Sequence, residues 1–105
     1  MDRSRELWLI SQTWTQGEFG EMKQTTQGRR VFCDVGSVSA SEYFEAAQVG
    51  IAPEYRVTMF APDYQGEQIA QLDGVTYGIY RTYLGKNETI ELYLERKSGV
   101  TYGAE

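Results

Sequence analysis

Residues 69–94, IAQLDGVTYGIYRTYLGKNETIELYL, decide the fold of this chain. Apolar and polar side chains alternate along this stretch, which is typical of strands with one buried face. Asp73-Gly74 is a dipeptide that favours a two-residue type I′ turn, and Lys86-Asn87 offers a second turn. The stretch therefore predicts three antiparallel strands joined by two tight turns.

The two turns also predict a pairing register. The first hairpin places Leu72 opposite Val75 and Ala70 opposite Tyr77. The second hairpin is expected to pair Tyr83 with Ile90, Arg81 with Leu92, and Ile79 with Leu94. Both registers put one apolar set on a single face, which a one-residue slip would scatter: Ala70, Leu72, Val75, Tyr77, Ile79, Tyr83, Ile90, Leu92 and Leu94.

Arg81 is the misfit on this face. We expect it near a rim, where its stem packs and its head reaches water or a carboxylate.

The opposite face of the same strands is polar but rich in tyrosine. Tyr80 is expected opposite Tyr93, and Ile69 lies beside Gly78. Tyrosine is enriched at protein interfaces because it combines a large ring with a hydrogen-bonding tip. Ile69, Tyr80 and Tyr93 are therefore candidates for a subunit interface, and ordinary cross-strand stabilisation is the alternative.

Upstream, a strand over 31–38 leads into a short helix over 39–49. Ser39-Ala40-Ser41-Glu42 has the form of a capping box, and Gly50 and Pro53 end the helix. Tyr43 and Phe44 are expected to pack on the sheet, with a partner contact as the alternative. A further strand over 55–61 follows.

At the N-terminal end, residues 7–15 alternate and predict another half-buried strand. Trp8, Ile10 and Trp14 share one side of it, and Ser11, Thr13 and Thr15 share the other. Residues 17–28 are mostly polar and are interpreted as a long exposed loop, a length that is uncommon unless the loop is functional or disordered.

Composition excludes several kinds of chemistry. The 105 residues fit a single domain, 1–105, and contain one cysteine and no histidine. A Ser-His-Asp triad or a Cys/His metal site is therefore ruled out, and Cys33 is interpreted as a small core residue. No glycine-rich phosphate loop is present. We expect no enzyme, no cofactor and no metal.

The charge and hydropathy of the chain point away from nucleic-acid and membrane binding. A net charge of −5 argues against tight nucleic-acid binding, which depends on neutralising phosphates. No apolar run approaches the length of a membrane span, and no signal-peptide pattern is found.

Three phrases carry a resemblance: SVSASEYFEAAQVG at 37–50, PEYRVTMFAPDY at 53–64 and LDGVTYGIYRTYL at 72–84. In order and spacing, the chain resembles the head-tail joining family of tailed bacteriophages, also called head-closure or stopper proteins. The resemblance implies a small antiparallel β-barrel with a short helix and long loops. The alternation alone leaves barrel and sandwich open.

The resemblance also implies a function. Proteins of this family form a ring, generally sixfold, that closes the DNA exit channel after packaging and docks the tail. The implied partners are other copies of the chain, the adaptor and portal above, and a tail-completion or tail-tube protein below. Genomic DNA would pass without sequence-specific binding, no membrane would be involved, and the location would be the neck of a virion assembled in the host cytoplasm.

In family members, the segment between the second and third strands can project into the channel. That segment corresponds here to 36–53, so the candidate channel-facing residues are Ser39, Ser41, Glu42 and Glu45. Residues 17–28 are the alternative channel element. Two other functions stay open: another ring-forming connector or tail-completion protein, and a small β-barrel that binds peptide or nucleic acid.

Overall fold

Six strands and one α-helix make up residues 5–96, the part of the chain that the computed structural model describes. The elements are β1 (Arg5–Gln16), β2 (Met22–Gly36), α1 (Ala40–Ala47), β3 (Pro53–Phe60), the 3₁₀ turn η1 (Ala61–Asp63), β4 (Ile69–Leu72), β5 (Val75–Leu84) and β6 (Thr89–Arg96). The prediction of a mainly β, antiparallel fold with one short helix is confirmed.

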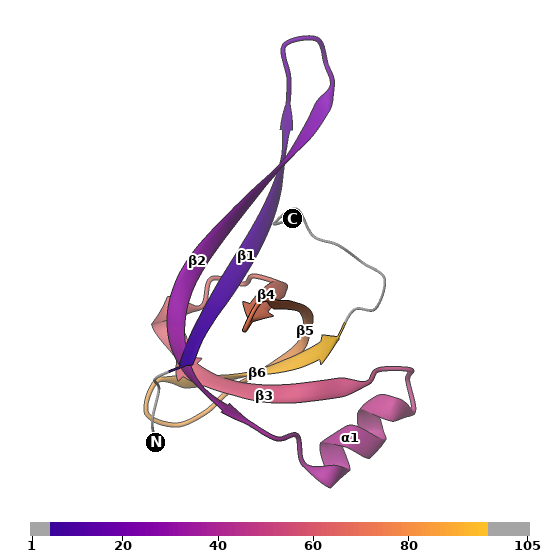
Figure 1. The fold of residues 1–105 in the computed structure, drawn as a ribbon, viewed down its shortest axis with the longest axis vertical. Coiled ribbons are helices and arrows are strands. Elements are labelled where there is room, and N and C mark those ends of the chain that lie inside the picture. The colour runs from indigo at the N-terminus through magenta and orange to yellow at the C-terminus, as the bar shows by residue number, and fades with distance from the viewer. Residues whose placement is uncertain (1–4, 97–105) are drawn as a thin grey trace.

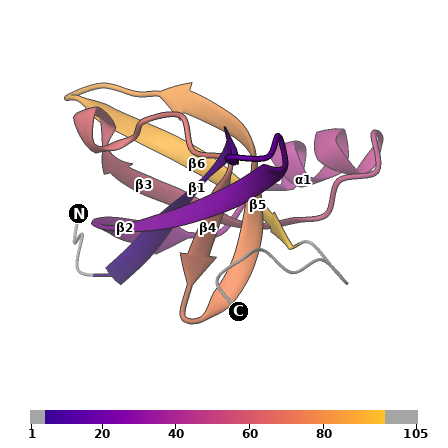
Figure 2. The same cartoon turned by 90° about the horizontal axis from the view of Figure 1, so that it is seen from above.

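The six strands form one sheet that closes on itself in the order β1-β2-β3-β6-β5-β4, with β4 returning to β1. Closure leaves a single inward face, which decides between the two architectures that the alternation left open. Figures 1 and 2 show α1 outside this closed sheet and the far half of the β1–β2 hairpin rising away from it.

The core is the inward face of the closed sheet. Its most deeply buried large side chains are Leu7, Leu9, Val57, Met59, Leu92 and Leu94, each at most 1% exposed. Cys33 lies among them, fully buried, as its interpretation as a core residue predicted. Val31, Ala70, Leu72, Tyr77 and Ile90 complete the same cluster.

The first hairpin has the predicted register. Leu72 pairs with Val75 and Ala70 with Tyr77. Asp73 and Gly74 have φ values of 53° and 79°, the left-handed conformations that a type I′ turn requires.

The pairing register of the second hairpin differs from the predicted register by one residue over most of its length. Its loop has three residues instead of two, because Asn87 and Glu88 both adopt positive φ and Gly85 N–H donates to Thr89 O. Arg81 therefore pairs with Tyr93, Thr82 with Leu92 and Tyr83 with Glu91. The predicted core position of Tyr83 is wrong, since this side chain is 57% exposed.

A β-bulge at Tyr80 restores the register, so that Ile79 pairs with Leu94 as predicted. The bulge inserts one extra residue on β5 and cancels the extra residue of the loop. Leu92 and Leu94 lie in the core as predicted. The predicted pairs Tyr83–Ile90 and Arg81–Leu92 are nevertheless wrong, and only Ile79–Leu94 is found.

Strand β1 buries the other side from the one expected. Leu7 and Leu9 point into the core, whereas Trp8 is 42% and Trp14 61% exposed. Ile10 is the one residue of the predicted buried set that is buried, at 3% exposure. The sequence analysis grouped the two tryptophans with Ile10 on the apolar side of this strand, but Leu7 and Leu9 fill the interior of the closed sheet instead.

The predicted loop over 17–28 is also wrong. Residues 22–28 belong to β2 and pair with β1 without interruption from Arg5↔Cys33 to Gln16↔Met22. Beyond the Ile10↔Ile69 pair, no third strand among residues 5–96 joins this hairpin, so it continues as a two-stranded ribbon. We refer to residues 11–27 of this ribbon as the arm.

Helix α1 has the predicted ends. Ser39 is the N-cap, and its Oγ accepts a hydrogen bond from Glu42 N at 3.2 Å. Gly50 adopts φ 82°, and Ile51 N–H returns to Ala46 O at 3.0 Å. The expected packing of Tyr43 and Phe44 on the sheet is wrong: they are 48% and 66% exposed, and Ala46 is the buried residue of the helix.

Candidate interaction surfaces

Helix α1 is held to the sheet by one carboxylate. Glu42 accepts a hydrogen bond from Tyr80 Oη at 2.8 Å and from Arg81 Nη2 at 2.5 Å. The bulge of β5 brings these two donors, neighbours in the chain, to the same carboxylate, a common use of bulges. The Glu42 side chain is only 13% exposed as a result. The expectation that Arg81 reaches a carboxylate is confirmed.

The protonation of this cluster favours the ion pair. Burial alone would raise the pKa of Glu42, but the hydrogen bonds from Arg81 and Tyr80 outweigh it and hold the pKa below its ordinary value. Burial and the neighbouring Glu42 carboxylate raise the pKa of Tyr80. Glu42 is therefore charged and Tyr80 neutral at physiological pH, the states that this contact needs.

The cluster continues onto β6. The guanidinium carbon of Arg81 lies 4.2 Å from the centroid of the Tyr93 ring, within cation–π range. Tyr93 Oη donates to Glu91 at 2.7 Å, and the Tyr80 and Tyr93 rings lie 6.1 Å apart. We call Glu42, Tyr80, Arg81 and Tyr93 the α1 anchor.

The α1 anchor joins residues that the sequence analysis had placed in two separate surfaces. Glu42 was a candidate channel residue, while Tyr80 and Tyr93 were candidates for a subunit interface. Ser41 and Glu45 are exposed on α1, and Ser39, exposed just before it, uses its Oγ to cap the helix. Their role in a channel stays a prediction.

The interface candidates are less accessible than expected. Ile69 is 7% and Tyr93 8% exposed. Ile69 lies on β4 opposite Ile10, away from the α1 anchor. Of the three, Tyr80 alone is more than slightly accessible, so this set by itself offers little area to another subunit.

Helix α1 instead presents other apolar side chains to solvent. Tyr43 and Phe44 make an edge-to-face contact, with ring centroids 6.2 Å apart, and Val49, just after the helix, is 73% exposed. A groove of about 370 Å³ runs between the helix and β5, lined by Glu42, Glu45, Ala46, Val49, Ile51, Tyr80 and Arg81. These rings are exposed to solvent, whereas the sequence analysis expected them to pack on the sheet.

The arm carries the most exposed apolar group of the described residues. Phe19 at its turn is 89% exposed, and Trp14 and Met22 are 61% and 58% exposed. Because directly paired residues share a face, Trp14 and Met22 lie on one face with Gln16 and Gln24. The other face carries Ser11, Thr13, Thr15, Lys23, Thr25 and Gln27. The arm thus has an apolar face and a polar one.

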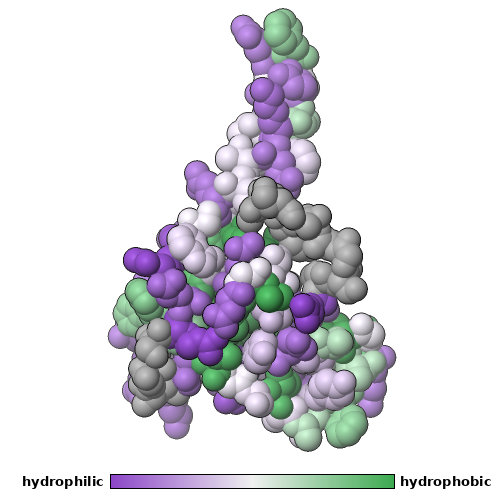
Figure 3. Space-filling view, in the orientation of Figure 1, coloured by the Kyte–Doolittle hydropathy of each residue, from purple (hydrophilic) through white to green (hydrophobic). Residues whose placement is uncertain are grey.

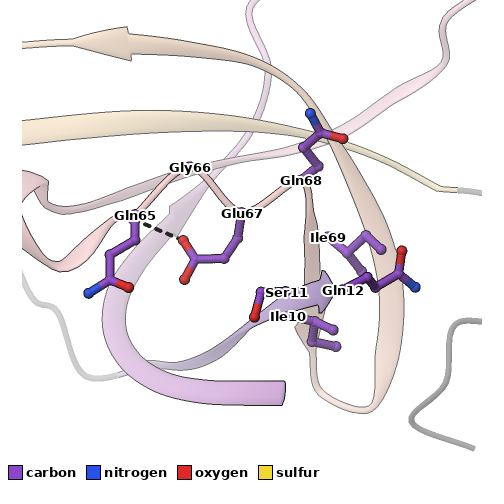
Figure 4. A pocket seen from close by; sticks show the side chains of 8 residues that line it. All are labelled: Ile10, Ser11, Gln12, Gln65, Gly66, Glu67, Gln68 and Ile69. Carbon is purple, nitrogen blue, oxygen red and sulfur yellow. Dashed lines mark hydrogen bonds between the residues drawn. The ribbon is translucent and has the colours of Figure 1, made fainter. Parts of the chain in front are cut away.

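The base of the arm is fixed by a buried carboxylate on the loop before β4. Glu67, whose side chain is 6% exposed, forms an ion pair with Arg29 of β2 at 2.8 Å and accepts from Gln65 N–H at 2.9 Å. Burial would raise its pKa, but the hydrogen bonds from Arg29 and from the backbone outweigh burial and lower it. Figure 4 shows Glu67 turned back toward Gln65, beside a polar hollow of about 390 Å³ at the foot of β1.

The sequence analysis did not predict the Arg29–Glu67 ion pair. Arg29 comes directly after residues 17–28, which were interpreted as a loop, and nothing in the sequence places it next to Glu67, 38 positions away. The outward Trp8, Arg30 and Phe32 were likewise not singled out as a group. Arg30 lies 5.5 Å from the Phe32 ring centroid, on the outside of β2.

Compared with protein-family models and with curated proteins, the chain matches none. Within residues 5–96, no helix has the length and apolar character needed to cross a membrane. The fold is a small closed β-sheet with two elements outside it that expose apolar side chains, the arm and α1.

Proposed function

We propose that this chain is a structural subunit of the head-tail connector of a tailed bacteriophage. In this role it forms a ring that closes the DNA exit channel and docks the tail. It acts by assembly and performs no catalysis. The arm is the observation that carries the assembly role, and the resemblance of the sequence to head-tail joining proteins supplies the particular assembly.

The arm supports an assembly role because it contributes little to the fold of its own chain. An isolated two-stranded hairpin is marginally stable in water, and this one exposes Trp14, Phe19 and Met22. Tryptophan and other aromatic side chains are enriched where proteins bind one another. We expect a partner protein to cover a projection of this kind in the assembled state.

Charge supports a passage for DNA rather than a binding site. A net charge of −5 gives little counterion release with nucleic acid, so DNA would be repelled and not held. In the proposed ring, Ser39, Ser41 and Glu45, which are polar or acidic and exposed on or just before α1, are the residues that would line the channel. Glu42 is neutralised by Arg81 and adds little to that lining.

The proposal predicts that genes for a portal and an adaptor protein lie beside the gene of this chain, and it is tested by co-expressing the chain with these two proteins. Electron microscopy of the purified complexes should show an additional ring below the adaptor that contains this chain. Heads filled in its absence should lose their DNA. A chain that associates with the tail tube and never with portal complexes would instead indicate a tail-completion protein. A chain that binds neither would overturn the proposal.

A further inference from the structure

One edge of the arm lacks the features that usually protect an exposed strand edge. Strand β4 pairs with β1 only from Trp8 to Ile10, so within the described part of the chain residues 11–16 have β2 as their one neighbour. Figure 3 shows the outer part of the arm standing clear of the closed sheet. The sequence of 11–16, SQTWTQ, has no charge and no proline, and it pairs with β2 without a bulge. Charges, prolines and bulges are what natural proteins use to keep strand edges from pairing. We call residues 11–16 the free edge of β1.

The free edge begins at a polar hollow. Strand β4 starts at Ile69, opposite Ile10, and the preceding residues 65–68 do not pair with β1. A hollow of about 390 Å³ lies there, and Figure 4 shows Ser11 and Gln12 of β1 and the loop residues Gln65 and Gln68 around it. Serine hydroxyls and glutamine amides both donate and accept hydrogen bonds, so this hollow suits a polypeptide backbone.

The sequence contains a second copy of one of its own strand segments. The pentapeptide GVTYG occurs at 74–78 and again at 99–103, outside the described residues. The first copy opens β5 and pairs with β4, with Val75 opposite Leu72 and Tyr77 opposite Ala70. Valine, threonine and tyrosine all favour strands. The second copy therefore has a sequence that forms an edge-pairing strand in this same fold.

The C-terminal segment is long enough to reach the free edge. Arg96, the last residue of β6, pairs with Tyr77, which pairs with Ala70, which pairs with Leu9 of β1. Arg96 and Leu9 are thus three strand spacings apart, about 14 Å measured along the sheet. The nine residues 97–105 span up to about 30 Å when extended.

We propose that residues 99–103 add as a third strand to the free edge of β1 in the same molecule. Val100 and Tyr102 then lie on the face of Trp14, and Thr101 lies on the face of Thr13. A two-stranded hairpin is marginally stable in water and a third strand with apolar side chains stabilises it, so the C-terminal segment stiffens the arm. This contact lies within one molecule and does not depend on the proposed ring.

Hydrogen exchange measured by NMR tests the contact by comparing the full chain with a chain that ends at Arg96. Every second N–H of β1 points away from β2. Among residues 11–16, these amides should exchange at least about tenfold more slowly in the full chain, because the added strand accepts their hydrogen bonds. The amides of residues 90–94 should exchange alike in both chains, which shows that the shortened chain is folded. Equal exchange at the free edge in the two chains overturns the inference.

A second variant keeps the full length of the chain. Val100→Pro combined with Thr101→Pro should remove the protection as the truncation does, because one of two neighbouring N–H groups in a strand must face β1 and proline has none. Lys97→Ala, outside the repeated pentapeptide, is the matched control and should leave the protection unchanged. Protection that survives the two prolines overturns the inference.

Cross-linking locates the segment. Thr101→Cys is combined with Thr13→Cys at the free edge or, as the control, with Glu54→Cys, which is exposed beside the end of β6 on the side away from β1. Cys33 gives little background, because it is fully buried and burial raises its pKa to about 11.

A short bismaleimide should join Thr101→Cys to Thr13→Cys within one molecule and give little product with Glu54→Cys. A yield with Glu54→Cys that equals or exceeds the yield with Thr13→Cys overturns the inference, since Glu54 lies nearer to Arg96. Dimers as the main product of the Thr13→Cys pair in dilute solution overturn it as well, because the occupant of the edge is then a second copy of the chain.

Discussion

Glu42 on α1 and Arg81 on β5 are 39 positions apart in the chain, and their side chains meet with Nη2 2.5 Å from Oε1. This ion pair, together with the Tyr80 hydroxyl, is the main polar link between the helix and the closed sheet. Ala46 is the buried residue of the helix, so the helix has little apolar packing to replace the link. The position of α1 therefore depends on one carboxylate.

Glu42→Ala is expected to loosen α1 while the barrel stays folded. The lost hydrogen bonds to charged groups are worth about 1–2 kcal/mol here, at the low end because Arg81 is 44% exposed. Hydrogen exchange of the amides of residues 42–48 should speed up more than that of β3 or β6. Glu45→Ala, on the exposed side of the same helix, is the control and should change stability by under about 0.5 kcal/mol. Equal exchange in both variants would mean that the anchor does not hold the helix.

Acid should destabilise the protein through two carboxylates. The pKa values of Glu42 and Glu67 are both lowered in the folded state. A carboxyl group with a lowered folded pKa contributes stability that is complete above its unfolded pKa of about 4.3 and is lost as pH falls through the lower folded value. Urea unfolding between pH 6 and pH 3 should therefore show a steep loss of unfolding free energy at the acid end of this range. Glu67→Gln should be less stable than wild type at pH 6 and should lose less on acidification; the same slope in both proteins would contradict the assignment.

Leu92→Asp should unfold the chain, whereas Glu91→Ala should not. Leu92 is fully buried in the core, and an unpaired carboxylate there costs several kcal/mol, comparable to the whole stability of a small domain. Glu91 faces outward and accepts one hydrogen bond from Tyr93. Its loss is expected to cost about 1 kcal/mol. Circular dichroism melts of the two variants make the comparison, and similar melting temperatures would be inconsistent with the core described above.

The sequence predicted the strands, their antiparallel order and most of the core, because alternation and the Asp73-Gly74 turn are local signals. The predicted pairing register of β5 and β6 failed between two irregularities that offset each other. The third residue of the 86–88 loop and the bulge at Tyr80 each shift the register by one, so Ile79 still meets Leu94. Tyr83, which lies between the two irregularities, is the residue that the error displaced. A bulge has no sequence signature of its own, so only the structure could place Tyr80 and Arg81 together against Glu42.

The arm was not predicted from the sequence, for a different reason. Its residues are threonine, glutamine, glycine and charged side chains, which lack the apolar alternation of a half-buried strand. The ribbon has no buried face because no third strand or sheet lies against it, and so the pattern that identifies strands was absent. Trp14 and Met22 were the remaining signal, and the alternation over residues 7–15 had grouped Trp14 with Trp8 and Ile10 on one side of a half-buried strand.

Removing the arm should leave the barrel intact and abolish assembly. Replacing residues 12–26 with a two-residue Asn-Gly turn keeps Leu7, Leu9, Val31 and Cys33, the residues of the core cluster that β1 and β2 contribute, along with the Arg29–Glu67 ion pair at the base. Since the removed pairs contact no third strand, the melting temperature is expected to change by only a few degrees, equivalent to about 1 kcal/mol. Leu9→Ala is the matched control, with an expected loss of about 2–5 kcal/mol from a cavity in the core and no direct effect on the arm.

Sedimentation and electron microscopy should then find the armless chain monomeric and absent from rings, and Leu9→Ala, at a temperature where it is folded, still able to assemble. An armless chain that forms rings as well as wild type would show that the arm is not the assembling element, and one that fails to fold would show that the ribbon belongs to the core structure after all.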